Sequence, residues 1–431
     1  MIEQFIYFLY TVILILFTPI ILLILAIRYP VTFFRHFFDG FANRIGKYKN
    51  VANLNSKSIW IHAASLGECR AAIPLIYEIK KKYSQTPIVF TSTTINGIKE
   101  AQRLQLSNHI YYAPIDFPWI LLRAFKLFNP KIIILLESEI WANWLKIAKK
   151  LEVPVVIANA RISKKSFYRY QQFLILTRIL MNKISFICAR EEQDYSRFIF
   201  LGMNKKKISL TGNLKYDIHP NHLNTDQKNK NTPHALVWVA GSIQEQEAKY
   251  ILKVFIELRK KFKNLKLIMA LRHLDNINEV IFKIKPTQFI YTFQSKIQLN
   301  NSIDWDILLW DTFGNLWEAY RQANIVFIGG SLVPKGGQNP IEPAWFEKTI
   351  IFGPYMDNFT EPAQLLIKKN GAEQIQNSDE LLTKMDLLLS HPEKMKTLGL
   401  NAKNALNEFK GQATQKTITI LEKFIKTEIH H

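Results

Sequence analysis

The sequence predicts an α/β protein with two doubly wound parallel sheets, preceded by one apolar helix. The chain has 431 residues, which is too long for one ordinary core and predicts two domains of about 180 residues each. From Ser58 onward, short apolar runs alternate with longer amphipathic ones, the pattern of a parallel sheet covered on both faces. A polar, basic stretch at residues 217–235 interrupts this alternation and predicts a linker.

The first element is an uncharged, nearly all apolar run from Phe5 to Ile27, whose length matches the ~20 residues that cross a bilayer. A cleaved signal peptide is disfavoured because Glu3 is the only preceding charge and no small-residue cleavage site follows. A surface helix is disfavoured because the run has no evident polar face. The run therefore predicts a single-pass anchor at residues 1–30. By the positive-inside rule, the basic residues that follow place the rest of the chain in the cytoplasm; they are Arg28, Arg35, Arg44, Lys47 and Lys49.

Residues 31–216 are expected to form the first α/β domain. Its predicted strands are Ile59–Ala63, Ile88–Thr91, Ile110–Ala113, Ile132–Leu136, Val155–Ala158, Phe186–Ala189 and Ile208–Leu210. Its clearest helices are Cys69–Tyr83, Trp119–Phe128, Trp141–Leu151 and Phe167–Asn182. Apolar strands separated by helices indicate a parallel sheet that is buried on both faces.

Residues 236–410 repeat the pattern as a second domain, and residues 411–431 are expected to form a C-terminal helix. The predicted strands are Leu236–Ala240, Leu267–Ala270, Phe289–Thr292, Ile307–Leu309, Ile325–Ile328 and Thr349–Phe352. Ligands of doubly wound sheets bind beyond the carboxyl ends of the strands. A ligand site is therefore expected there, in a cleft between the two domains.

Composition restricts the class of partner without choosing one. The 56 Lys and Arg residues exceed the 35 Asp and Glu residues, giving a net charge of +21. That balance suits nucleic acid, an anionic membrane or a phosphorylated acidic substrate. Binding to nucleic acid is disfavoured because the basic residues are dispersed. Cys69 and Cys188 have no zinc-site spacing and favour a reducing compartment.

Glycine turns and helix starts follow several strands of the second domain. Glycine lets the backbone approach a phosphate closely, helix N-termini present free N–H groups, and arginine binds phosphate in a bidentate manner. A carboxylate in a first helical turn can accept from ribose hydroxyls. The segments are Gly241-Ser242, Leu271-Arg272, Gly314-Asn315-Leu316, Gly330-Ser331 and Asn339-Pro340-Ile341-Glu342. Together they predict a nucleotide-sugar site.

Glu68 is the leading candidate for a general base, in the segment HAASLGE at the end of the first predicted strand. A structural alternative is a capping box, because Ser65 precedes Glu68 by three residues at a helix start. A third interpretation is a nucleophile elbow at Ser65, in which case the protein would be an anchored serine hydrolase. This is disfavoured because Ala63 replaces the first glycine of that motif and no histidine partner is evident.

Two further segments add charged candidates at strand ends. Glu137 and Glu139 follow the strand that ends at Leu136. One carboxylate can help to hold an acceptor or a developing positive charge, and the other can orient local backbone or a basic group. Lys215, in TGNLK, can reach a phosphate or carboxylate, although the residues alone favour a solvated lysine at the start of the linker. Asp304 and Asp306 mimic an Asp-x-Asp metal site but precede a strand. No catalytic metal and no cofactor are therefore predicted.

The ordered set HAASLGE, LESEIW, TGNLK, AGS, RH, FGNL, FIGGS and GGQNPIEPA resembles the Kdo (3-deoxy-D-manno-octulosonic acid) transferases that build the inner core of lipopolysaccharide. The resemblance covers about Ser58 to Tyr355 and includes the anchor. It implies a GT-B fold of two Rossmann-like domains, a CMP-Kdo donor and a lipid A precursor (lipid IVA) as acceptor. It also implies the cytoplasmic face of the bacterial inner membrane and contact with its lipids.

Site roles follow from the resemblance by motif. Glu68 matches the family's proposed base, and Glu137 and Lys215 match a pair that supports the transition state. The segments matching CMP contacts are Leu271-Arg272, Gly314 to Leu316 and Asn339 to Glu342. Two positions depart from the family pattern: Ala142 stands where proline is common, and Gln338 replaces a frequent histidine, so no role is assigned to Gln338.

The expected chemistry is a metal-independent inverting displacement. Arg272, Lys215 and helix N-termini are expected to neutralise the leaving phosphate. The nearest alternative is another membrane-associated GT-B glycosyltransferase that uses a UDP-sugar.

Overall fold

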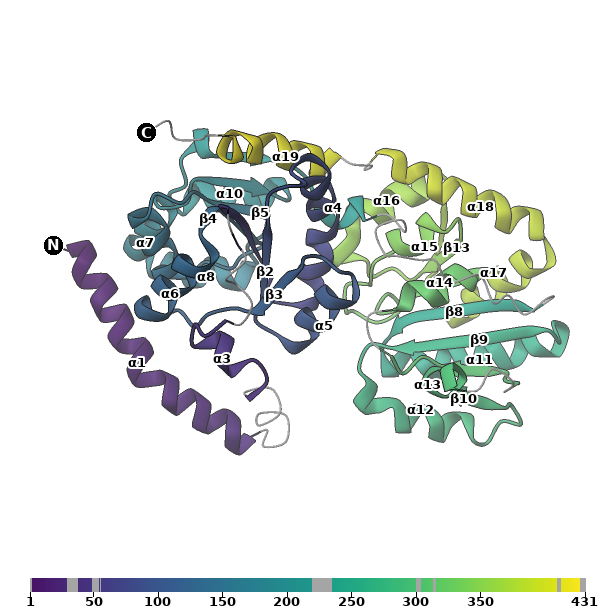
Figure 1. Ribbon diagram of the computed structural model, residues 1–431. Coiled ribbons are helices and arrows are strands. Elements are labelled where there is room, and N and C mark those ends of the chain that lie inside the picture. The colour runs from purple at the N-terminus through teal and green to yellow at the C-terminus, as the bar shows by residue number, and fades with distance from the viewer. Residues whose placement is uncertain are drawn as a thin grey trace. The chain divides into compact units, whose positions relative to one another are not determined.

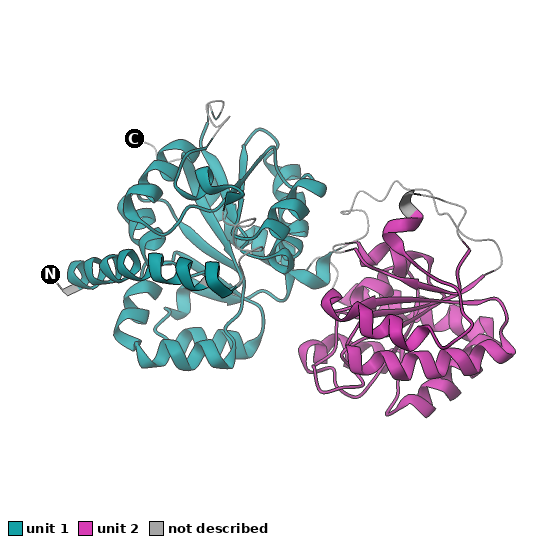
Figure 2. Ribbon diagram, turned by 90° about the horizontal axis from the view of Figure 1, so that it is seen from below, with its two compact units in different colours: residues 1–224, 409–431 teal, residues 225–408 magenta. Residues whose placement is uncertain are grey.

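The computed structural model describes residues 2–28, 38–48, 54, 56–218, 235–299, 304–312, 315–408 and 412–426. The chain forms two compact units, coloured separately in Figure 2. Unit 1 comprises residues 1–224 and 409–431, and unit 2 comprises residues 225–408. Each unit has a seven-stranded sheet whose strand pairs are parallel. The predicted α/β class with two doubly wound sheets is confirmed.

Unit 1 alternates strands and helices after an N-terminal helix, α1 (Ile2–Arg28) (Figure 1). The strands are β1 (Ser58–His62), β2 (Ile88–Ser92), β3 (His109–Tyr112), β4 (Pro130–Leu136), β5 (Val155–Ala160), β6 (Phe186–Ala189) and β7 (Ile208–Leu210). The helices are α3 (Phe41–Arg44), α4 (Leu66–Lys82), α5 (Ile95–Arg103), α6 (Pro118–Phe128), α7 (Ala142–Lys150), α8 (Lys164–Gln172), α9 (Leu174–Met181), α10 (Glu192–Phe200) and α19 (Gln412–Ile425). Short 3₁₀ turns are η1 (Lys205–Lys207) and η2 (Leu214–Asp217).

The unit 1 sheet has the order β3-β2-β1-β4-β5-β6-β7. Every residue of β1, β2 and β5 is buried. Because successive side chains of a strand point to opposite faces, both faces of the sheet are covered. The chain reverses its direction of progress between β1 and β4, which makes the carboxyl ends of these two strands the switch point of the sheet.

The C-terminal helix α19 returns to unit 1. Asp217, at the end of η2, accepts hydrogen bonds from the Thr414 N–H and hydroxyl, both at 2.7 Å. On α4, Lys82 pairs with Glu422 of α19 at 2.8 Å. The segment predicted as a separate C-terminal helix therefore completes the first unit.

Unit 2 repeats the alternation. Its strands are β8 (Leu236–Ile243), β9 (Leu265–Leu271), β10 (Tyr291–Phe293), β11 (Ile307–Leu309), β12 (Ile325–Ile328), β13 (Thr349–Phe352) and β14 (Ala372–Gln374). Its helices are α11 (Glu245–Lys261), α12 (Ile277–Ile284), α13 (Gln294–Leu299), α14 (Leu316–Gln322), α15 (Ile341–Trp345), α16 (Thr360–Lys368), α17 (Ser378–Ser390) and α18 (Pro392–Ala405). Its 3₁₀ turns are η4 (Leu274–Asn276), η5 (Asp357–Phe359) and η6 (Leu406–Glu408).

The unit 2 sheet has the order β10-β11-β9-β8-β12-β13-β14. Its switch point lies between β8 and β12, where Gly241 is opposite Ile328. The hydrophobic core of unit 2 is built from buried side chains such as Trp238, Phe255 and Phe327. The same rule therefore predicts one ligand edge in each unit, after β1 and β4 in unit 1 and after β8 and β12 in unit 2.

Candidate active site

The strand order brings two of the predicted segments to one edge of unit 1. β1 and β4 are neighbours, with His62 opposite Leu135. The loop after β1 leads to Glu68, and the loop after β4 begins with Glu137. Both carboxylates therefore follow the strands that flank the switch point.

Glu68 is held in place by the turn that starts α4. Ser65 is the N-cap residue, and its Oγ accepts from the Glu68 N–H at 3.4 Å. The Glu68 carboxylate reaches back: Oε2 accepts from the Ala64 N–H at 2.7 Å, and Oε1 accepts from the Ser65 hydroxyl at 3.1 Å. The predicted Ser-x-x-Glu capping contact is thus present. It does not exclude a proton-accepting role, because a carboxylate offers about four lone-pair positions.

The surroundings of Glu68 favour its protonated form. Burial raises the pKa of Glu68 to about 7, and the negative charges of Glu139 and Glu137 also raise it. The hydrogen bonds from Ala64 and Ser65 act in the opposite direction. A carboxyl group with a pKa near neutrality can take up and release a proton at the working pH, which is what general-base chemistry requires.

Glu137 and Lys215 form an ion pair beside this carboxylate. Lys215 Nζ lies 2.7 Å from Glu137 Oε1, and the side chains are 27% and 13% exposed. Glu137 has a left-handed backbone (φ 57°). Lys215 lies in η2, where its N–H donates to Asn213 Oδ1 at 3.1 Å. The structure thus brings together the two residues that the sequence placed 78 positions apart.

Glu139 adds a third carboxylate. Its Oε2 accepts from Trp141 Nε1 at 2.8 Å and lies 4.0 Å from His62 Nε2. Burial raises the pKa of Glu139, and the charge of Glu137 adds to the rise. Burial lowers the pKa of His62 to about 4, so this imidazole is neutral at neutral pH. His62 was not predicted as a site residue; its position as the last residue of β1 was the available signal.

The Ser65 hydroxyl is not arranged as a hydrolase nucleophile. It donates to Glu68, and among the described residues no hydrogen bond joins it to a histidine. The ring of His62, three residues earlier, contacts Thr91 Oγ1 through Nδ1 at 3.0 Å instead. A Ser–His pair is the basis of that chemistry, so the geometry does not support the serine hydrolase interpretation.

In unit 2, the predicted donor-binding residues follow neighbouring strands at one edge of the sheet. Gly241 and Ser242 lie just before the last residue of β8, Leu271 ends β9, and Gly330 and Ser331 follow β12. At Gly241, an added Cβ would lie 2.2 Å from the Tyr320 hydroxyl, so glycine allows α14 to approach β8 closely. Ser242 has a left-handed backbone (φ 55°).

A buried carboxylate that was not predicted organises this edge. Glu247, on α11, is 0% exposed. Its Oε2 accepts from the N–H groups of Gly330 (2.6 Å) and Gln244 (2.8 Å), and its Oε1 accepts from Ser331 (3.1 Å) and Leu332 (2.9 Å). The glycine turn therefore has its N–H groups engaged by the protein.

These contacts give Gly330 and Ser331 a structural part. Ser331 is fully buried, and its Oγ accepts from the Gly353 N–H at 2.8 Å. Contact of either residue with a donor stays a prediction. The signal for Glu247 was the capping-box spacing from Gln244, which places a Glu three residues after the N-cap.

The remaining donor candidates differ in accessibility. Arg272 is exposed, and its N–H donates to Ile243 O at 2.9 Å, which fixes its backbone beside β8. Leu271 is buried. Asn315 accepts from Trp310 Nε1 at 3.0 Å and from the Thr312 hydroxyl at 2.8 Å, just before Leu316 opens α14. Gly314 lies outside the described residues.

The helix predicted to open at Asn339 is short. α15 has five residues and follows Pro340 as its N-cap, so its dipole is weaker than that of a full helix. Asn339 Oδ1 accepts from the Ile341 N–H at 3.0 Å, and Asn339 Nδ2 lies 3.5 Å from Glu342 Oε1. Asn339 and Glu342 are half-buried, whereas Pro340 and Ile341 are buried.

The Asp-x-Asp sequence is occupied by ion pairs. Asp304 lies 2.9 Å from Lys266 Nζ, and Asp306 pairs with Arg259. Both precede β11 and so lie at the amino edge of the sheet. In the described part of the chain, no group of three His, Cys, Asp or Glu side chains is arranged to hold a metal ion.

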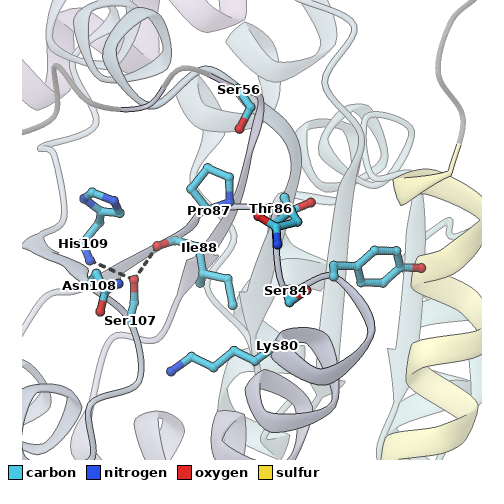
Figure 3. A pocket seen from close by; sticks show the side chains of 11 residues that line it. Ser56, Lys80, Ser84, Thr86, Pro87, Ile88, Ser107, Asn108 and His109 are labelled. Carbon is cyan, nitrogen blue, oxygen red and sulfur yellow. Dashed lines mark hydrogen bonds between the residues drawn. The ribbon is translucent and has the colours of Figure 1, made fainter.

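A cavity of about 470 Å³ opens elsewhere in unit 1 (Figure 3). Its lining includes Lys80, Thr86, Ser107 and His109, from segments that precede or begin β2 and β3. Ser107 Oγ accepts from the His109 N–H at 2.9 Å. Because these are the amino ends of the strands, the cavity lies at the opposite edge of the sheet from Glu68, and no predicted site residue lines it.

Comparison with known proteins gives a consistent assignment. The family described as 3-deoxy-D-manno-octulosonic-acid transferase (kdotransferase) matches residues 39–218. The 3-deoxy-D-manno-octulosonic acid transferase of Haemophilus influenzae is 31% identical over 436 residues, covering 98% of this chain and 99% of that protein. The corresponding protein of Aquifex aeolicus is 29% identical, over 79% of this chain and 88% of its own length.

Solved structures support the fold. A glycosyltransferase from Rickettsia africae superimposes with a TM-score of 0.56 at 14% identity, covering 87% of this chain and 100% of its own. A UDP-GlcNAc 2-epimerase from Neisseria meningitidis gives the same TM-score at 15% identity, over 85% and 100%. Both likenesses show a GT-B-like pair of Rossmann-like domains. The relatives show that this chain belongs to the 3-deoxy-D-manno-octulosonic acid (Kdo) transferase family of glycosyltransferases.

Proposed function

We propose that this protein transfers Kdo from CMP-Kdo to a lipid A precursor, lipid IVA, during assembly of the inner core of lipopolysaccharide. The observation that carries the proposal is Glu68. In a chain related to Kdo transferases over 98% of its length, this half-buried carboxylate has a pKa of about 7 and lies beside the Glu137–Lys215 pair.

The proposed reaction is a single inverting displacement. A hydroxyl oxygen of the acceptor sugar attacks the anomeric carbon of Kdo, and Glu68 takes the hydroxyl proton. The bond between that carbon and the phosphate oxygen breaks, and its electron pair leaves with CMP. Glu68 suits this step because its raised pKa makes the carboxylate a stronger base than an exposed one.

The two units have separate parts in this proposal. Residues 31–216 bind the acceptor, and residues 236–410 bind CMP-Kdo beyond the carboxyl ends of β8, β9 and β12. Arg272 is the exposed cation suited to the phosphate, and Glu342 can accept from ribose hydroxyls. Arg272 and Lys215 supply positive charge for the leaving group, so the reaction is proposed to proceed without a metal ion.

Several basic residues of unit 1 that could bind acceptor phosphates are engaged within the unit. Arg44 donates to Thr93 O at 2.8 Å, Arg70 pairs with Glu100 at 2.9 Å, and Lys80 donates to Gln105 O at 2.8 Å. Arg35 and Lys49 lie outside the described residues. Lys47 is exposed and is proposed to meet a lipid phosphate.

The proposed location is the cytoplasmic face of the bacterial inner membrane. The support is α1, a helix whose length and composition suit a membrane, with a mean hydropathy of 2.8 over its most apolar 18 residues. The basic residues that follow α1 favour a cytoplasmic position for both units. Such a location would hold the enzyme at the surface that contains its lipid acceptor.

The test is a product assay. Membranes containing the protein are incubated with a tetra-acylated lipid A precursor and either CMP-Kdo or a UDP-sugar, and the products are weighed by mass spectrometry. A mass increase of whole Kdo units with CMP-Kdo alone supports the proposal; transfer from the UDP-sugar alone refutes it. Excess EDTA should leave the rate unchanged, and a loss that magnesium restores would contradict the metal-free mechanism.

A further inference from the structure

The helix α1 has two different faces. Tyr7, Tyr10 and Thr11 lie on one side, at the i, i+3 and i+4 spacing of a single helical face. Large apolar side chains elsewhere on the helix are exposed: Phe5, Phe8, Leu16, Phe17, Leu23 and Ile27 are between 52% and 72% exposed. The apolar run therefore carries a narrow polar stripe. The stripe is not evident in the sequence because none of its side chains is charged.

The polar stripe is docked on unit 1 around Asp116. The Tyr10 hydroxyl donates to Asp116 Oδ2 at 2.8 Å. Asp116 is 4% exposed and also accepts from the N–H groups of Asn143 (3.2 Å) and Trp144 (3.1 Å), in the first turn of α7. Thr11 Oγ1 lies 3.3 Å from Asn143 Nδ2. The α1 contact is thus tied to a buried carboxylate that also caps α7.

Two further contacts hold the first turns of α1. The ring of Tyr7, which is 1% exposed, lies under Lys146 at 4.8 Å and Lys183 at 5.5 Å. Lys183 also pairs with Glu3. Figure 1 shows α1 running past α7 at the edge of unit 1. The N-terminal part of the helix, from Glu3 to Thr11, is therefore fixed by side chains of a folded, polar domain.

A helix docked in this way leaves only a short segment for crossing a bilayer. Beyond Thr11, α1 has 17 residues, 12–28, which span about 25 Å, whereas the hydrocarbon core is about 30 Å thick. The chain must also return to unit 1 within the nine residues that separate Arg28 from Phe38, because Asp39 Oδ2 accepts from the Tyr112 hydroxyl at 2.7 Å. A return strand through lipid would leave backbone polar groups without partners.

We infer that α1 lies along the membrane surface, with its polar stripe on unit 1 and its opposite apolar face in the outer part of an anionic phospholipid bilayer. Exposure of so many apolar side chains to water is unfavourable, and such side chains suit the boundary between headgroups and acyl chains. Lys146 beside the helix and Arg28 at its C-terminal end match anionic headgroups. Trp119, 54% exposed and three residues beyond Asp116, is a residue type enriched at that boundary.

The in-plane helix and the single pass differ in where the N-terminus lies. Both native cysteines are buried, so one introduced cysteine can report its own side of the membrane. Gln4→Cys is compared with Lys164→Cys, an exposed position on α8, in spheroplasts treated with a membrane-impermeant maleimide. An in-plane helix predicts that both are labelled only after permeabilisation. Labelling of Gln4→Cys in intact spheroplasts, with Lys164→Cys protected, would overturn the inference.

Cross-linking tests the docked state without relying on sidedness. A short bismaleimide should join the cysteines of Glu3→Cys/Lys183→Cys, because the native side chains form an ion pair. The matched control, Ile27→Cys/Lys183→Cys, places the first cysteine about 36 Å further along the helix and should not be joined.

The locked protein is then mixed with vesicles of phosphatidylethanolamine and phosphatidylglycerol and sedimented. Binding equal to that of the unlocked protein supports an in-plane helix. Loss of binding upon locking would show that α1 must leave unit 1 to enter the membrane, which would refute the inference. Neither readout depends on Kdo transfer, so failure of this inference can be distinguished from failure of the proposed activity.

Discussion

The switch points of the two sheets follow one topological rule but carry different chemistry. In unit 1, the segments after β1 and β4 present the carboxylates Glu68, Glu137 and Glu139, and Lys215 of η2 pairs with Glu137. In unit 2, the loops after β8 and β12 present a glycine turn whose N–H groups are bound by buried Glu247. One edge displays charged groups that can exchange protons, and the other fixes the shape of a backbone.

This difference matches the two tasks of a glycosyltransferase. A base benefits from a raised pKa, and burial, followed by the charges of Glu139 and Glu137, raises the pKa of Glu68. A nucleotide sugar needs a rigid surface that it can approach, and a buried carboxylate with four N–H partners makes the turn rigid. Substitutions in unit 1 should therefore change the rate and its pH dependence, whereas those in unit 2 should change stability and donor binding.

The largest effect is expected from Glu68→Gln. The amide cannot accept the hydroxyl proton, so transfer should fall by about 10²–10⁴-fold. CMP binding, measured by calorimetry, should stay within about twofold, because the proposed donor-binding residues belong to unit 2. Glu78→Gln on the same helix α4 is the control and should retain the native rate. A Glu68→Gln enzyme with near-native turnover would remove the distinction between the two edges.

A second large effect is expected from Glu247→Gln, on stability. The amide group would turn one donor toward backbone N–H groups and leave a buried donor unsatisfied, which should lower the free energy of unfolding by about 3 kcal/mol. Glu257→Gln, at an exposed pair with Lys260 on the same helix α11, should cost less than about 0.5 kcal/mol. Urea denaturation of the full chain measures both. Equal losses would show that Glu247 is not a structural centre of unit 2.

The comparison also shows which features the sequence can predict. The predicted bounds of β6, β7, β11, β12 and β13 agree with the structure because short apolar runs between polar residues mark buried strands. β14 (Ala372–Gln374) was missed because a three-residue edge strand with Glu and Gln has no such pattern. The predicted helix Phe167–Asn182 is two helices, α8 and α9, because its amphipathic pattern continues across the break at Phe173.

The candidate site divides in the same way. The proximity of Glu68, Glu137 and Lys215 was predictable because each follows the end of a strand, and strand ends converge in a parallel sheet; their roles stay predictions. Glu247 was not predicted because its partners at Gly330 and Ser331 lie more than 80 residues away in the sequence. The docking of α1 was missed for a related reason: Tyr10 contacts Asp116, 106 residues away, and an isolated apolar run does not indicate its partner.

A smaller effect is expected from Lys215→Met. Removing Nζ leaves the Glu137 charge unpaired near Glu68, so the pKa of Glu68 should rise above about 7. The base is active when deprotonated; the acidic limb of the rate profile should therefore move to higher pH. At a fixed pH on that limb, the rate should fall about tenfold if the pKa of Glu68 rises by one. Lys215→Arg should restore most of the rate, and Lys207→Met, at an exposed lysine, should change nothing.

The smallest effect is expected from Glu139→Gln, and its sign is opposite. The charge of Glu139 raises the pKa of Glu68, so removing it should lower that pKa and move the acidic limb to lower pH, by less than about 1 on the pH scale. Glutamine keeps an acceptor for Trp141 Nε1, which separates loss of charge from loss of the contact. The measurement is kcat/KM from about pH 5 to 9, which reports the free enzyme.

Opposite movements of the limb in Lys215→Met and Glu139→Gln, with cancellation in the double variant, would show that the groups act through their charge on one base. A limb that moves the same way in both variants, or in neither, would mean that the pH dependence belongs to another group. Glu68 would then be only the residue that caps α4, and the two edges would differ in shape but not in proton chemistry.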